Sequence, residues 1–579
     1  MEQHSIQKIE VKPALTPPNW LLGLLIFLYP FFFIFQGGDL SDTGYFAIRY
    51  QNFFNDFREG IVSSQTFLTY FVGGWWMRLF PSAGVLGILF PRVLLFHGTM
   101  LFIYFTLKDI KPRKVLLVSM LCGEVFAFRF TSMVLSYNSF SLFFLTIMVS
   151  ITWRGIKTRK DFWFFGAGIF LSLASLARIP NVLILPCMMI FLAIINLYDH
   201  KNKNITMKIR NTVKQNTWLL AGVFFVLLCF LAILKSSGQL VAYSHGLFST
   251  VNVLSSVKVN SPYSFVNLLA NYWTDFKQFF PYAFGVTFAI FILSYVRCLS
   301  KKSWFKFFVS SLFVLFFVIH FYGDFSYRNS IKYFSPAICI LPIWLAFRPN
   351  SNIDIQRRSL ILLVCMCSLI HVAGTNTGLF LKLGWWMPFL FPLLACTVWE
   401  QKTSRFYVFK IQWPSILKVV AVVIVLVSVI NRIGWIYHVD TGELCRLRAI
   451  YPVNHSLMRG IYTTKKRADH IEAVMRAINM NLEKDDSFFI YGHQPLFYYL
   501  AAKRPPIQIF WMANRVSPPD YYFSELNKFI ARTNHYPLVL ITNKKILGDE
   551  GNSLLEDFLI KNRYLCIEKL KTFEIWKVI

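Results

Sequence analysis

The sequence predicts a polytopic α-helical membrane protein that carries a C-terminal extracytoplasmic α/β domain. Its 579 residues are 55% hydrophobic and 18% aromatic, and only 15% are charged. Because about a quarter of the residues in a typical globular chain are charged, this composition excludes a disordered chain, a coiled coil and a secreted disulfide scaffold. Apolar runs recur along most of the chain, whereas its final part alternates helix-like and strand-like segments.

About thirteen apolar segments suit a spanning helix, which needs roughly 20 residues. We expect helices at 19–35, 85–107, 115–128, 137–153, 162–178, 181–197, 217–234, 281–297, 306–321, 336–347, 359–374, 385–399 and 417–433. The first segment has no clear small-x-small cleavage site, so we interpret it as a retained helix rather than a signal peptide.

The net charge of +30 is distributed as a topology signal. Six short connections carry three to five Lys or Arg residues each, whereas the long loop 36–84 contains only Arg49, Arg58 and Arg78. Basic loops stay on the cytoplasmic side of a membrane. The basic excess therefore indicates orientation, and nucleic-acid binding has no separate support.

This orientation divides the chain into three predicted parts. Residues 1–18 form a cytoplasmic N-terminus, residues 19–433 form the transmembrane domain with the outer loop 36–84, and residues 434–579 form an exported α/β domain. We expect a bacterial inner membrane, with the last domain in the periplasm.

The exported tail shows a helical pattern followed by strand-like runs. Residues 466–482 place Ile471, Val474, Met475 and Ile478 at helical spacing. Strands are expected at 487–491, 507–511, 538–542, 564–567 and 573–578. Alternating helices and strands of this kind predict a small α/β domain.

The first outer loop opens with two carboxylates, Asp39 and Asp42, in a chain that is poor in acidic residues. Three positions apart, they share a face if they lie on one helical turn. A carboxylate at the water–membrane boundary can deprotonate a hydroxyl nucleophile. The alternative is that either aspartate caps the helix that follows.

These features together resemble the GT-C superfamily of integral-membrane glycosyltransferases, which includes lipid A aminoarabinose transferases and protein O-mannosyltransferases. The resemblance covers nearly the whole chain and includes the segments Leu135-Ser136-Tyr137-Asn138 and Ala177-Arg178-Ile179-Pro180-Asn181. Many members carry an adjacent acidic pair in the first loop. Here Thr43 follows Asp42, which leaves open whether Asp39 substitutes for the missing partner.

The resemblance implies transfer of a sugar from a polyprenyl-phosphate donor to an acceptor on the outer face, with inversion at the anomeric carbon. Asp42 would be the general base, with Asp39 as the second catalytic candidate. Cations must stabilise the leaving phosphate, and the outer-side candidates are Arg129, Arg178, Arg328, Lys332 and Lys382. Arg129 has an alternative role as the partner of Glu124 in the same apolar run.

Further substrate contacts are expected at polar residues near outer helix ends and in the tail. Tyr137, Asn138 and Asn181 could bond sugar hydroxyls, although helix capping explains them equally well. His493 follows a predicted strand, and α/β sheets bind ligands at the carboxyl ends of their strands. We therefore expect it to contact the acceptor, which is a lipid, a polysaccharide or a protein.

Other functional classes remain as alternatives. One is a transporter or flippase of lipid-linked glycans, and another is a surface-polysaccharide polymerase or ligase. The sequence contains no Walker lysine motif and no dinucleotide glycine pattern. No cofactor is firmly indicated, but two carboxylates leave a divalent metal open. The expected partners are the lipid-linked donor, the acceptor and membrane lipids, with no nucleic acid.

Overall fold

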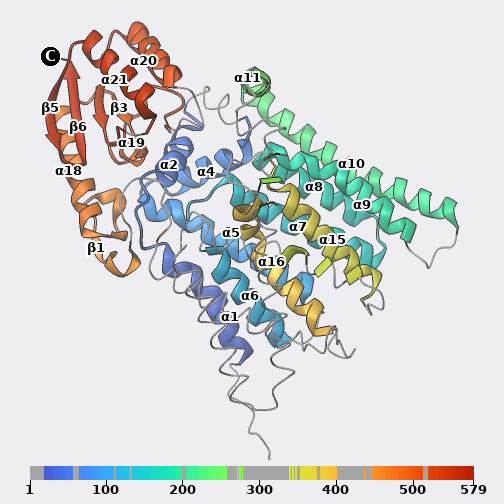
Figure 1. Cartoon of the computed structure of the whole chain (residues 1–579). Helices are drawn as coiled ribbons and strands as arrows, with labels where there is room; N and C mark the ends of the chain where they lie inside the picture. Colours follow the sequence, from blue (N-terminus) through green and yellow to red (C-terminus); the bar gives the residue numbers. More distant parts are fainter. Residues whose placement is uncertain are drawn as a thin grey trace, which may run out of the picture.

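The structure is a computed structural model in which the elements are described over most of the chain. The described residues are 18–55, 64–109, 113–128, 133–198, 204–256, 353–373, 379–400, 445–510, 519–544 and 546–578, with single positions within 270–347 and at 436 and 512. Figure 1 shows a helical bundle with the C-terminal tail, drawn in orange and red, at one of its ends.

Helices are present at every predicted segment that the structure describes in full. They are α1 (Asn19–Leu28) with the 3₁₀ turn η1 (Tyr29–Phe33), α5 (Gly84–Leu107), α6 (Arg113–Phe128), α7 (Tyr137–Thr158), α8 (Phe162–Ala177), η2 (Ile179–Leu183) with α9 (Ile184–Tyr198), α10 (Ile205–Ser236), α15 (Ile355–Ile370) and α16 (Leu379–Glu400). The helix α11 (Leu240–Ser256) was not expected. The predicted segments 281–297, 306–321 and 417–433, and most of 336–347, lie outside the described residues.

Within the described residues, four helices are long and apolar enough to cross a membrane. They are Gly84–Leu107, Tyr137–Thr158, Ile179–Tyr198 and Ile205–Ser236. Shorter apolar helices cover Asn19–Phe33, Phe162–Ala177 and Leu383–Thr397. The protein is therefore an integral membrane protein by the length and composition of its helices, while the total of about thirteen spans stays a prediction.

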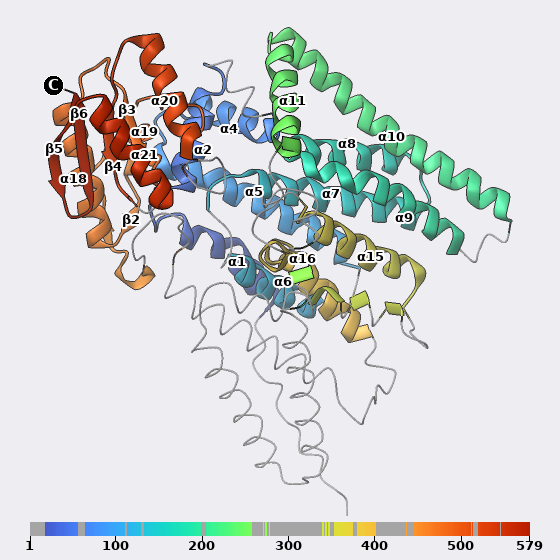
Figure 2. The ribbon, with the colours of Figure 1, turned by 45° about the horizontal axis from the view of Figure 1, so that its top comes forward.

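The helix α10 begins twelve residues before the predicted 217, because its first turn is capped. Asn204 Oδ1 accepts a hydrogen bond from the Thr206 amide at 2.9 Å, as favoured N-cap residues do. Figure 2 shows α10 lying along α8 and α9 at the edge of the bundle. The bundle has its own large apolar core among α5, α6, α7 and α16, and this core includes the fully buried Phe96, Phe128 and Trp386.

The tail contains two small sheets and three longer helices. Strands β1 (Tyr451–Pro452) and β2 (Tyr462–Thr463) pair antiparallel. A four-stranded sheet has the order β3-β4-β6-β5, from β3 (Phe488–Tyr491), β4 (Leu538–Ile541), β6 (Phe573–Val578) and β5 (Tyr564–Leu570). Strands β3 and β4 are parallel, with Phe488 opposite Leu538, and β6 runs antiparallel to both of its neighbours. The helices are α18 (Lys465–Asn481), α20 (Pro519–Thr533) and α21 (Gly548–Lys561), with a short α19 (Leu496–Leu500).

The prediction of a strand at 507–511 is wrong for residues 507–510, which form no strand. Ile507 and Phe510 are nevertheless buried, because this segment packs on the first outer loop. The Gln508 carbonyl accepts a hydrogen bond from Arg49, and the Phe510 ring lies 5.5 Å from that of Tyr45.

In its described residues, 36–55 and 64–84, the first outer loop contains two helices, α2 (Asp42–Asn52) and α4 (Phe67–Leu79), which lie between the bundle and the tail (Figure 1). One continuous core joins them to the tail, from Phe46 and Tyr70 through to Val474, Phe497 and Leu540. The start of the loop and the tail, more than 400 residues apart in sequence, thus meet in one structural unit.

Candidate functional site

Asp39 is used as a cap for α2. Its Oδ1 accepts a hydrogen bond from the Ser41 amide at 3.3 Å, and its Oδ2 accepts one from the Thr43 amide at 3.1 Å. The side chain is 8% exposed. These bonds satisfy amides that have no partner within the helix at its first turn. Asp39 therefore precedes the helix, and the two aspartates do not share a helical turn.

Asp42 is the first residue of α2 and is half-buried. The helix N-terminus carries a partial positive charge, which favours the ionised carboxylate there. Tyr45 and Arg49 follow at spacings of three and seven, so they lie on the same face of α2 as Asp42. Of the two aspartates, Asp39 is the one that accepts hydrogen bonds from the Ser41 and Thr43 amides.

That face of α2 is turned toward the tail. Arg49 is 1% exposed, and its Nη2 donates to the Gln508 carbonyl at 2.6 Å. Its guanidinium lies 4.7 Å from the centre of the Phe510 ring and 5.3 Å from that of Tyr45. Tyr70 on α4 donates to the Tyr45 hydroxyl at 3.3 Å. Aromatic rings and a buried cation thus surround the Asp42 face.

His493 reaches the same region from the tail, in the loop that follows β3. Its burial lowers the pKa to about 4, and the nearby Asp39 carboxylate opposes this shift. The imidazole is therefore neutral at neutral pH, and a neutral ring can accept a hydrogen bond from an acceptor hydroxyl. The structure brings His493 and Asp39 together, which sequence spacing did not show.

Tyr137 and Asn138 start α7 beside α2. The Tyr137 ring centre lies 6.1 Å from that of Phe46. Asn138 is 8% exposed, and none of the described residues donates a hydrogen bond to its Oδ1. Both residues thus lie one layer below the aspartate helix, and their contact with a sugar stays a prediction.

Asn181 takes part in helix packing, and its contact with a sugar stays a prediction. The residue is fully buried, and its Nδ2 donates to Ser141 Oγ at 2.9 Å and to the Ala174 carbonyl at 2.8 Å. These bonds join η2 to α7 and α8. The Oδ1 of Asn181 accepts no hydrogen bond from any of the described residues.

Arg178 joins the end of α8 to the end of α15. It is 3% exposed, and its guanidinium donates to the carbonyls of His371, at 2.5 Å, and Ala373, just beyond α15. The adjacent Ile179 amide donates to the Gln65 carbonyl of the first outer loop at 3.1 Å. These bonds make Arg178 a structural link, and its contact with phosphate stays a prediction.

The other predicted cations are not described as side chains. Arg129, Arg328 and Lys332 lie outside the described residues, and Lys382 lies on α16 with its side chain outside the description. Their roles stay predictions.

Arg92 on α5 is a cation that the sequence analysis missed. It is 2% exposed, and its guanidinium lies 5.3 Å from the ring centres of Phe96 and Trp385 and 5.9 Å from that of Phe128. Among the described residues, none accepts a hydrogen bond from its Nε. A buried charge is costly unless an anion or hydrogen bonds compensate it. An arginine beside Pro91 in an apolar run was the available signal.

Arg92 also lies at a boundary between two cores. Its neighbour Val93 belongs to the core shared by the outer loop and the tail, whereas Phe96 belongs to the core of the bundle. Glu124, four residues before Phe128 on α6, is fully buried, without a hydrogen-bond partner among the described residues. Ionisable residues at such depth are functional candidates by default.

A divalent metal does not fit the residues described at this site. No group of three or more His, Cys, Asp or Glu side chains gathers in the described part of the chain. Both oxygens of Asp39 already accept amide hydrogen bonds. We derive no step through a metal.

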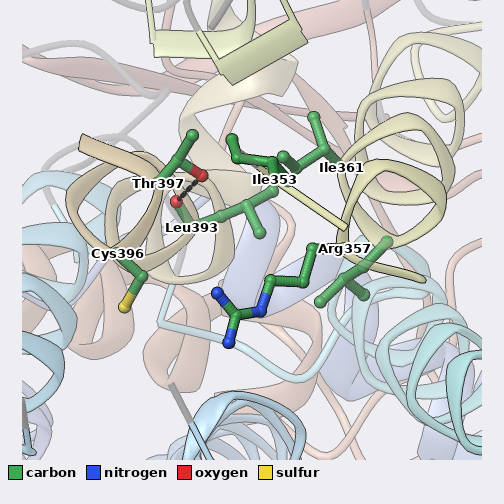
Figure 3. A pocket seen from close by; sticks show the side chains of 7 residues that line it. Ile353, Arg357, Ile361, Leu393, Cys396 and Thr397 are labelled. Carbon is green, nitrogen blue, oxygen red and sulfur yellow. Dashed lines mark hydrogen bonds between the residues drawn. The ribbon is translucent and has the colours of Figure 1, made fainter. Parts of the chain in front are cut away.

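A small cavity between α15 and α16 lies far from this site. Figure 3 shows Arg357 extending beside Leu393, near Cys396 and Thr397. The space open to water is about 10 Å³, which suits one water molecule. Arg357 lies about 20 Å along α15 from the end that Arg178 contacts, by the helical rise of 1.5 Å per residue. The cavity is therefore separate from the aspartate loop.

No protein-family model matches the chain, and no curated protein matches its sequence. Solved structures with a similar arrangement are those of archaeal oligosaccharyltransferases from Archaeoglobus fulgidus. The crystal structure with Zn and sulfate aligns with a TM-score of 0.49 at 11% identity, over 93% of this chain and 71% of that one. The structure of AglB with an inhibitory peptide and a dolichol-phosphate gives 0.45 at 11% identity, over 96% and 73%.

A third structure, tethered with an acceptor peptide containing the NVT sequon, gives a TM-score of 0.47 at 10% identity, over 93% and 71% of the two chains.

Proposed function

We propose that this protein transfers a sugar from a polyprenyl-phosphate donor to a hydroxyl acceptor at the outer face of the membrane. The observation that carries the proposal is the different use of the two aspartates. Asp39 caps α2 with both of its oxygens, whereas Asp42 stands half-buried at the helix start, where the bundle, the outer loop and the tail meet.

In this mechanism Asp42 is the general base. Its carboxylate takes the proton of the acceptor hydroxyl as that oxygen attacks the anomeric carbon. The bond between this carbon and the phosphate oxygen breaks, and its electron pair leaves with the polyprenyl phosphate. Attack opposite the leaving group inverts the anomeric configuration. We propose that the neutral His493 imidazole accepts a hydrogen bond from a group of the acceptor other than the attacking hydroxyl.

The leaving phosphate gains negative charge and needs a fixed cation. Arg92 suits this need because it is buried and aromatic rings surround it. It also lies at the boundary between the core shared by the outer loop and the tail and the core of the bundle. A prenyl chain below this level would lie among apolar helices, and the sugar above it would face the aspartate loop. Arg129, Arg178, Arg328, Lys332 and Lys382 remain proposed phosphate ligands.

The test follows release of free polyprenyl phosphate from a panel of polyprenyl-phosphate sugars by purified protein. Asp42→Asn keeps the size of the side chain but removes the base, so we expect loss of release with one consumed donor. Asp39→Asn keeps an acceptor for the amides and serves as the matched control. Equal rates for wild type and Asp42→Asn would contradict the role of Asp42.

Glu124 is the observation that supports a second candidate, a flippase of lipid-linked glycans. It is a fully buried ionisable residue in the bundle, as transporters carry along their pathways. In proteoliposomes, movement of a labelled lipid-linked glycan that persists in Asp42→Asn and stops in Glu124→Gln would favour this candidate.

A further inference from the structure

The tail bonds the main chain on both sides of Asp39. Beside Gln36, the Gly37 amide donates to the Tyr462 carbonyl at 2.9 Å, and the Tyr462 amide donates to the Phe35 carbonyl at 2.8 Å. The first loop thus adds a short parallel pairing to the tail at β2. This pairing fixes the register between segments that are more than 400 residues apart.

Side chains of the tail donate hydrogen bonds to the carbonyls of Gly37 and Gly38. Thr463 is fully buried, and its Oγ1 donates to the Gly37 carbonyl at 2.7 Å. Arg467 on α18 is 5% exposed, and its Nε donates to the Gly38 carbonyl at 3.0 Å. Gly37 and Gly38 have φ of 133° and 72°, a region that favours glycine.

The loop after β3 completes this contact. The Leu496 amide donates to the Leu40 carbonyl at 3.0 Å. Groups of the tail therefore bond the carbonyls of Phe35, Gly37, Gly38 and Leu40, on both sides of Asp39. The Asp39 side chain accepts hydrogen bonds from the Ser41 and Thr43 amides and so caps α2. Asp42, the first residue of α2, follows the last of these bonded carbonyls by only two residues. Its position therefore depends on these bonds.

Of these groups, Arg467 is the charged one. A hydrogen bond from an ionised donor is about twice as strong as a neutral one, and truncating a buried partner leaves the other group unsatisfied. We propose that Arg467 is a positioning residue, which holds the Gly38 carbonyl so that α2 presents Asp42 to the acceptor. The tail is then part of the transfer site. This inference rests on the proposed function.

The test compares variants of the full-length protein in the donor-release assay. We expect Arg467→Gln to lower kcat by about tenfold to 100-fold, the loss typical of a small misplacement of a catalytic group, with the KM for donor within about twofold. Arg467→Lys restores a donor and should recover part of kcat. Arg476→Gln, at an exposed position of the same helix, is the matched control and should match wild type.

Amide hydrogen exchange reports on the loop independently of activity. Arg467→Gln should speed exchange at Gly37, Ser41 and Thr43, whose amides are bonded in the wild type, while the amides of β4 keep their protection. Unchanged kcat and unchanged exchange would overturn the proposal. If no donor is consumed by wild type, the proposed function fails, and exchange alone decides the role of Arg467.

A second variant keeps the test decisive if Arg467→Gln does not fold. Thr463→Val preserves side-chain shape but removes the Oγ1 donor to the Gly37 carbonyl. We expect a loss of kcat of a few fold and faster exchange at Gly37. Wild-type kcat and exchange in this variant would overturn the role of the tail in positioning the loop.

Discussion

The close approach of Gly44 on α2 to the tail gives the sharpest test of the site. A Cβ at this position would lie 2.0 Å from the Leu496 nitrogen, 2.4 Å from its Cα and 2.6 Å from the Pro495 carbonyl carbon. Real Cβ atoms essentially never come within 3.0 Å of another heavy atom in this way, and all three atoms belong to the backbone. In Gly44→Ala, the start of α2 and the loop after β3 must therefore separate by at least 1 Å.

We expect this shift to lower donor release by about 100-fold, because a misplacement of about 1 Å costs this much in other sites. Overpacking typically destabilises by about 1–3 kcal/mol, although alanine favours a helix over glycine by about 1 kcal/mol. The assay pairs release of polyprenyl phosphate with thermal unfolding of the purified protein.

The matched control is Gly23→Ala on α1, where an added Cβ meets no atom within 4 Å. It should keep wild-type release and wild-type or slightly higher stability. Wild-type release by Gly44→Ala would refute the reasoning, because α2 and the tail could then separate without effect on the site. Equal loss in both variants would refute it as well.

Three further predictions concern the neighbouring side chains. Asp39→Ala should destabilise α2 by about 1 kcal/mol, as loss of an N-cap does, whereas Asp39→Asn should cost less stability. Chemical denaturation measures both losses, and equal losses would argue against the cap. Arg92→Gln should weaken binding of a polyprenyl phosphate at least tenfold, which corresponds to about 1.4 kcal/mol. Arg78→Gln is the control, because Arg78 is exposed and also makes a cation–π contact. Unchanged binding in Arg92→Gln would exclude Arg92 as the phosphate ligand. The pKa of His493 is about 4 in the folded protein, against 6.5 ordinarily. Between these pH values the unfolded chain binds more protons than the folded one, so the stability of the fold rises with pH. In denaturation at several pH values, the wild type should lose stability as the pH falls from about 6.5 toward 4, and His493→Gln should lack this loss.

Sequence patterns determined much of the helical and strand content. Apolar length predicted α5 and α8 to within a residue or two, because a spanning helix buries nearly every side chain in lipid or protein. Helical spacing of Ile471, Val474 and Ile478 predicted α18, and short apolar runs predicted β3 and β4. Apolar character alone misassigned 507–510, since a loop that packs on another segment is as apolar as a buried strand.

The candidate site was predicted only in part. The sequence pointed to Asp39 and Asp42 but left catalysis and capping open for both, because either role needs a carboxylate before a helix. The bonds from Ser41 and Thr43 assign the cap to Asp39. The Asn181 amide joins η2 to α7 and α8, a contact that spacing along the chain does not reveal.

The sequence by itself determined the class of this protein, because hydrophobic length and the distribution of Lys and Arg are local properties of each segment. The tertiary structure decided which distant groups meet. It placed Arg467 against the Gly38 carbonyl, His493 beside Asp39, and Arg92 between two cores. Such contacts join residues far apart along the chain, and they depend on how complete elements pack, so no local pattern of residues specifies them.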